Sequence, residues 1–167
     1  LNMPPRRTMA IAQQLYEGVD IEGEGTVGLI TYMRTDSLRI SEEAIAAAKE
    51  FIVGRYGQQY YPAKGANHYK AKASAQDAHE AIRPTYMENA KIEGTPQERK
   101  LYDLIWKRTI ASQMADAEVE KTTVTIAISN ETETFTATGE VVKFDGFLRV
   151  YRESYDDDVE TQEDEAR

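Results

Sequence analysis

At residues 28–37 the chain reads GLITYMRTDS, an apolar run that stops at three polar residues. β-Branched and aromatic residues favour an extended strand, and Thr-Asp-Ser favours the turn that would end it. Residues two positions apart in a strand lie on the same face, so we expect Tyr32 and Arg34 to point the same way. The segment therefore predicts a phenol and a guanidinium side by side.

Such a pair suits attack on a phosphodiester. A free tyrosine has a pKa near ~10 and is a poor nucleophile at neutral pH. A neighbouring cation stabilises the phenolate, and it can hold the phosphate oxygens as negative charge develops on them. Tyrosine and arginine are also ordinary in an exposed strand, and the chain has ten tyrosines. The pattern by itself thus leaves a structural role for Tyr32 open.

Length and composition exclude several classes of protein. The 167 residues are enough for one good core, or for two small cores that share an interface. The chain has no apolar run of the ~18 residues that a membrane span needs. It has no cysteine and two histidines, which argues against disulfides and against a structural zinc centre. We expect a cytoplasmic protein with no membrane partner.

The net charge of −9 is concentrated in residues 153–167, which carry eight acids and one base. Residues 1–113 carry 14 acids and 15 bases and are therefore close to neutral. Within them, residues 53–85 combine basic side chains with tyrosines and histidine. Such a mixture can contact phosphates and stack on unpaired bases, although a solvated loop with buried tyrosines explains it equally well.

Local patterns predict an α+β fold with a helical part before a β part. Helix signals delimit four helices, over residues 5–18, 41–56, 74–82 and 95–115. The segments 18–28 and 57–73 are expected to be loops. A period of two after residue 117 predicts antiparallel strands, with one turn at Ser129-Asn130 and a hairpin turn at Asp145-Gly146. We divide the chain into a helical domain at 1–114, antiparallel strands at 115–152 and an acidic, disordered tail at 153–167.

Three segments carry a resemblance to a known family. GLITYMRTDS at 28–37 resembles the active-site segment of bacterial type IA DNA topoisomerases. QDAHEAIRPT at 76–85 resembles a second hallmark of that family, and residues 6–18 resemble the helix that leads to its active-site strand. Met33, directly after the tyrosine, is similar to the bacterial topoisomerase I branch rather than to topoisomerase III or reverse gyrase.

The resemblance implies roles for individual residues. Tyr32 would attack single-stranded DNA to form a transient 5′-phosphotyrosine, and strand passage through the gap would relax negative supercoils without ATP. Arg34 would position the phosphate and stabilise charge, while His79 and Arg83 would bind DNA phosphate. The residues themselves also allow a structural histidine, and an ion pair between Arg83 and Glu80.

The resemblance also implies what lies outside this sequence. Residues 1–114 would be the tyrosine domain, and residues 115–152 one leg of a β-rich arch. The family binds Mg²⁺ in a Toprim domain, whose Asp-x-Asp pattern on a Rossmann-like strand is not found in this sequence. We therefore expect a fragment of a nucleoid-associated enzyme, with no cofactor of its own and no relaxation activity alone. Its partners would be DNA and the remaining domains of the same polypeptide.

Three smaller expectations remain. Asp36 and Ser37 are expected to cap the turn after the active-site segment rather than to take part in chemistry. A non-catalytic nucleic-acid-binding module, with Tyr32 structural, is one alternative to the enzyme. An interaction domain whose acidic tail recruits a basic partner is another.

Overall fold

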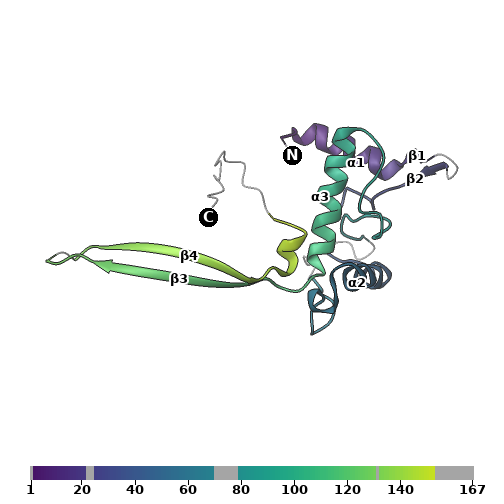
Figure 1. The fold of residues 1–167 in the computed structure, drawn as a ribbon. Coiled ribbons are helices and arrows are strands. Elements are labelled where there is room, and N and C mark those ends of the chain that lie inside the picture. Colours follow the sequence, from purple (N-terminus) through teal and green to yellow (C-terminus); the bar gives the residue numbers. More distant parts are fainter. Residues whose placement is uncertain (1, 22–24, 70–78, 131, 153–167) are drawn as a thin grey trace, which may run out of the picture.

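The computed structural model describes residues 2–21, 25–69, 79–130 and 132–152. Within these residues it has three α-helices and two antiparallel pairs of strands. Their bounds are α1 Pro5–Glu17, β1 Val19–Ile21, β2 Gly25–Val27, α2 Glu42–Tyr56, α3 Pro96–Ser112, β3 Glu118–Ala127 and β4 Thr134–Phe144. Figure 1 shows β3 and β4 as a long ribbon that projects away from the helical body. The predicted α+β class is confirmed.

The first two helices begin and end where their sequence signals lie. α1 has Pro5 in its first turn and stops at Gly18, whose φ of 105° favours glycine. The Ser41 hydroxyl caps α2 by accepting a hydrogen bond from the backbone N–H of Ala44. Both predicted helices are confirmed.

The third helix begins with a capping box. The Thr95 hydroxyl accepts from the Glu98 N–H, and the Glu98 carboxylate accepts from the Thr95 N–H. The helix ends at Ser112 rather than near residue 115. This start was readable from the sequence because it depends on residues three positions apart.

The apolar residues of α3 and its end predict a buried face formed by Leu101, Leu104, Ile105 and Met114. Leu104 and Ile105 are instead half-buried. Tyr102 and Trp106 are buried in their place, and each donates a hydrogen bond to a backbone carbonyl. Desolvation raises the pKa of Tyr102 to about 12. The buried residues on this helix and just after it are Glu98, Leu101, Tyr102, Trp106, Thr109, Ile110, Gln113 and Met114.

Three predictions in the N-terminal half were wrong. The segment expected as a loop at 18–28 contains the hairpin of β1 and β2. The segment 28–34 is not a strand, because its only bridge is Ile30 to Pro84 among the described residues. Of the helix expected at 74–82, residues 74–77 and Ala78 lie outside the described residues, and residues 79–82 are not helical. There the Ala81 N–H donates to the Arg39 carbonyl instead of to a helical neighbour.

The predicted hairpin turn at Asp145-Gly146 is also wrong. The chain instead forms the short 3₁₀ helix η2, Gly146–Arg149, which turns back to the helical body. The Phe147 N–H donates to the Ala115 carbonyl, and the Phe147 side chain packs against the core. The predicted turn would have led into a third strand. Residues 146–149 form a 3₁₀ helix instead, because the Phe147 ring packs against the core.

The ribbon of β3 and β4 is exposed on both faces. Its register pairs Val124 with Ala137 and Ile126 with Phe135, so these apolar side chains share one face. The opposite face carries threonines, with the pairs Thr123–Thr138 and Thr125–Thr136. Phe135 keeps 65% of its surface exposed, which leaves an apolar face without a covering layer in the described part of the chain.

A polar cluster joins the root of the ribbon to the helical body. The Tyr60 hydroxyl donates to Asp145 Oδ1 at 2.7 Å, and Arg149 donates to the Tyr60 oxygen at 2.9 Å. The hydrogen bond between Tyr60 and Asp145 raises the pKa of the Tyr60 phenol and lowers the pKa of the Asp145 carboxyl. η2 follows β4 directly and also packs on the helical body, so the structure shows no clear boundary at residue 114. The division of the chain into two domains there stays a prediction.

The two sequence motifs are joined by a dense set of hydrogen bonds centred on Thr31. Its hydroxyl donates to the Ala81 carbonyl at 2.9 Å and accepts from the Arg83 N–H at 2.9 Å. The Thr31 N–H donates to the Arg83 carbonyl, and the Thr85 N–H donates to the Leu29 carbonyl. Residues 28–31 are thereby held against residues 81–85.

We predict that Thr31→Val destabilises the protein by about 2 kcal/mol, because it leaves a part-buried donor and acceptor unpaired. Thr31→Ser keeps the hydroxyl and is expected to remain within about 1 kcal/mol of the parent. Urea unfolding of the three proteins measures the difference. Equal stability of the valine and serine variants would show that this junction contributes little.

Candidate active site

Tyr32 is presented on the surface by a buried neighbour. Met33 is 6% exposed and lies in the core, whereas Tyr32 is 42% exposed and Arg34 is exposed. The chain bends at Met33 and Arg34 rather than continuing as a strand. Tyr32 and Arg34 are thus both exposed, but the strand that was predicted to place them on one face is not formed. Their common orientation stays a prediction.

The active-site segment is also fixed to the end of α1. The Leu29 N–H donates to the Leu15 carbonyl at 2.8 Å. A Cβ atom at Gly28 would lie 2.9 Å from the Tyr16 carbonyl oxygen, so this close approach requires glycine. The backbone just before Tyr32 thus contacts α1 on one side and residues 81–85 on the other.

The Tyr32 ring contacts two other aromatic rings. The His79 ring centroid is 6.0 Å from that of Tyr32, with the planes at 60°. The Tyr16 ring lies edge-on to Tyr32 at 5.4 Å and 70°. The structure therefore brings together two predicted site residues, Tyr32 and His79. Tyr16 was not predicted, since only its position at the end of the helix before the motif pointed to it.

Arg34 and Arg83 lie in contrasting environments. Arg34 is exposed, and its guanidinium has no ion pair or hydrogen bond within the described ranges. Arg83 pairs with Glu80 at 2.7 Å and donates to the Pro84 carbonyl, and its side chain is 15% exposed. Arg34 is thus free to bind an anion, whereas Arg83 is used to shape its own segment. A contact from Arg83 to DNA stays a prediction.

Side-chain oxygens stabilise the turn at the end of the motif. The Thr35 hydroxyl accepts from the Ser37 N–H at 3.0 Å, and the Ser37 hydroxyl accepts from the Arg39 N–H at 3.2 Å. The hydrogen bond from Arg39 confirms the predicted capping role of the buried Ser37. The second capping oxygen comes from Thr35 and not, as predicted, from Asp36, which is exposed.

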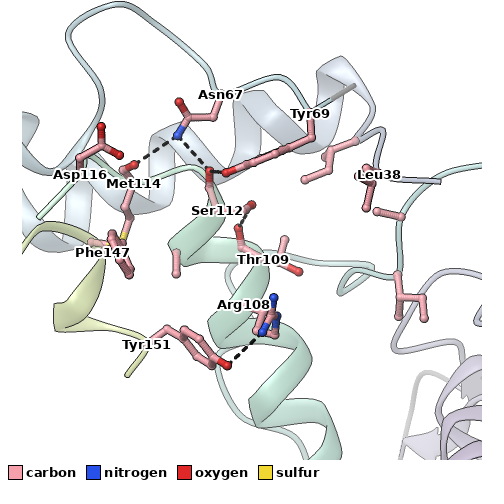
Figure 2. Close-up of a pocket in the computed structure, with 14 residues that line it drawn as sticks. Leu38, Asn67, Tyr69, Arg108, Thr109, Ser112, Met114, Asp116, Phe147 and Tyr151 are labelled. Carbon is pink, nitrogen blue, oxygen red and sulfur yellow. Dashed lines mark hydrogen bonds between the residues drawn. The ribbon is translucent and has the colours of Figure 1, made fainter. Parts of the chain in front are cut away.

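A cleft of about 480 Å³ lies next to both motifs but does not include Tyr32. Leu38 and Ile82 line it on one side, and the carboxyl end of α3 lines it on another. Figure 2 shows Asn67 and Tyr69 reaching the Ser112 carbonyl there, and Arg108 reaching the Tyr151 hydroxyl. Its polar groups are thus largely paired with one another. The exposed surface at Tyr32 is a better candidate for chemistry than this cleft.

The described residues offer no cluster of three or more histidine, cysteine or acidic side chains that could hold a metal ion. A Mg²⁺ ion therefore has no fitting site among them. In the same residues, no helix is long and apolar enough to cross a membrane.

Comparison with known proteins gives two matches. A family model for DNA topoisomerase matches residues 1–166. The structure of full-length topoisomerase I from Thermotoga maritima aligns with a TM-score of 0.75 and 36% sequence identity, over 93% of this chain. The aligned part is 25% of that protein, so this chain spans about a quarter of its length. With a family model over nearly all of its length and a 36% identical solved structure over 93% of it, the chain is a member of the DNA topoisomerase family.

Proposed function

We propose that this chain supplies the nucleophile of a type IA DNA topoisomerase, which breaks and rejoins one DNA strand without ATP. The observation that carries the proposal is the setting of Tyr32. It is an exposed phenol on a backbone held from two sides, and it lies beside His79 in a chain of the topoisomerase family.

The reaction begins with attack of the Tyr32 hydroxyl oxygen on a phosphodiester of single-stranded DNA. A bond forms between this oxygen and phosphorus while the bond from phosphorus to the 3′ oxygen breaks. The phenol loses its proton, and the departing 3′ oxygen gains one. The product is a 5′-phosphotyrosine and a 3′-hydroxyl, and the reverse step reseals the strand after another strand has passed. Because the covalent link replaces one phosphoester by another, resealing needs no ATP.

Two side chains support this step. The Arg34 guanidinium, free of intramolecular partners in the described part of the chain, holds the phosphate oxygens as their charge rises. His79 lies against the Tyr32 ring and contributes a hydrogen bond to the phosphate. Arg83 acts mainly through its pair with Glu80, which fixes the segment that bears His79.

The enzyme needs more than this chain. The resemblance to type IA topoisomerases implies that the acids that bind Mg²⁺ lie in the remaining domains of the polypeptide. The exposed apolar face of β3 and β4, with Val124, Ile126 and Phe135, is suited to pack against further strands of those domains. Because the substrate of the proposed enzyme is DNA, we expect it to act at the nucleoid in the bacterial cytoplasm.

The first prediction concerns the nucleophile. The chain is mixed with the remaining domains and Mg²⁺, and a labelled single-stranded oligonucleotide is added. We expect an adduct that survives denaturation, and we expect Tyr32→Phe to abolish it. Tyr86→Phe, at a tyrosine that is 47% exposed, is the matched control and should retain it. An adduct that persists in Tyr32→Phe would favour the non-catalytic binding module.

The second prediction concerns charge stabilisation. Arg34→Ala is expected to slow adduct formation by about a hundredfold, since it removes a group aimed at developing charge. Arg99→Ala, at an exposed arginine on α3, should leave the rate within about twofold. Single-turnover cleavage at saturating DNA gives both rates. Equal rates for the two variants would remove Arg34 from the mechanism.

The third prediction concerns the isolated chain. These 167 residues alone should not relax a negatively supercoiled plasmid in the presence of Mg²⁺, because the metal-binding acids are expected elsewhere. Gel analysis of plasmid topoisomers tests this. Relaxation by the purified chain that Tyr32→Phe abolishes would contradict it.

A further inference from the structure

Tyr16 contacts the candidate nucleophile without lying in its sequence motif. It is the penultimate residue of α1, and its ring meets Tyr32 edge-on at 5.4 Å. An edge-to-face arrangement is one that aromatic pairs prefer, because the positive ring edge meets the negative ring face. The contact is therefore attractive rather than a mere crossing of two exposed side chains.

The backbones that bear the two rings are held together. The Leu29 N–H donates to the Leu15 carbonyl, one residue before Tyr16. Gly28 approaches the Tyr16 carbonyl so closely that any side chain there would collide with it. These main-chain contacts thus fix the position of the Gly28–Leu29 backbone relative to the end of α1 that bears Tyr16.

The Tyr32 ring has a particular need for such support. At 42% exposure it is not held by core packing, and exposed side chains change rotamer within picoseconds to nanoseconds. In-line attack on phosphorus requires the oxygen to stay close to one position, and small displacements are costly in rate. Contacts with the Tyr16 ring and with the His79 ring limit the directions in which the Tyr32 ring can turn.

We propose that Tyr16 is a positioning residue, whose ring holds the Tyr32 ring in the orientation from which its hydroxyl attacks DNA. The inference rests on the proposed function of Tyr32. It assigns the effect to the aromatic ring of Tyr16 and not to its hydroxyl, because the contact joins the two rings.

The test compares three variants of the chain. Tyr16→Phe keeps the ring, and Tyr16→Ala removes it. Met9→Ala is the matched control, because Met9 lies two turns earlier on the same face of α1 and is 43% exposed, close to the 41% of Tyr16. Single-turnover cleavage is measured with the remaining domains and Mg²⁺ present. We expect Tyr16→Ala to cleave about tenfold more slowly at saturating DNA. Its half-saturating DNA concentration and its pH profile should be unchanged, and the other two variants should match the parent.

A second measurement uses the 167-residue chain without DNA. With tyrosine ring carbons labelled, Tyr16→Ala should shift the Tyr32 ring signals in NMR spectra, and Tyr16→Phe should leave them near their parent positions. Cleavage by Tyr16→Ala at the rate of Met9→Ala, or unchanged Tyr32 signals, would overturn the positioning role. Loss of the adduct in Tyr32→Phe tests the proposed function separately. A failure of that function would therefore be distinguished from a failure of the ring contact.

Discussion

The hydrogen bonds of Thr31 are the constraint on which the candidate site depends. Through one hydroxyl and one N–H, this residue ties the segment that ends in Tyr32 to the Ala81 and Arg83 backbone, some 50 residues further along the chain. The same tie places His79 beside the Tyr32 ring, because His79 lies just two residues before Ala81. Two motifs that look separate in the sequence are thus one structural unit.

In that unit the Tyr32 side chain is exposed, while the backbone that carries it is held in place. A phenol that must meet DNA has to be accessible, yet an accessible side chain is poorly held. Here the backbone is fixed by α1 and by residues 81–85, Met33 anchors the segment in the core, and ring contacts restrict the side chain itself. The neighbouring Arg34 is left free of partners in the described residues, while Arg83 is committed to its ion pair.

Features set by near neighbours were predictable from the sequence. The Ser41 cap and the capping box of Thr95 each depend on residues within one helical turn, and both were found where expected. The segment 28–34 was misread as a strand because its partners, Leu15 and Arg83, come from opposite directions in the chain. Tyr16 was missed for the same reason, since its contact follows from the close approach of Gly28 to α1.

The catalytic assignment is likewise stronger than sequence periodicity alone allowed. The pattern of GLITYMRTDS, taken without the family resemblance, favoured a structural role for Tyr32 over a catalytic one. The strand that motivated the pairing with Arg34 is absent, but burial of Met33 turns both neighbours outward. Family membership supports the proposed catalytic role of Tyr32, and its exposure would let DNA reach the hydroxyl.

The measurement that tests the central claim most directly is identification of the residue that carries DNA. The covalent adduct is trimmed with nuclease and digested with a glutamate-specific protease, and its peptides are analysed by mass spectrometry. Cleavage after Glu24 and Glu42 gives the peptide 25–42, in which Tyr32 is the single tyrosine, and cleavage after Glu17 separates it from Tyr16. We predict the nucleotide mass on the peptide 25–42. Its appearance on the peptide that contains Tyr16, or on any other tyrosine, would contradict the account.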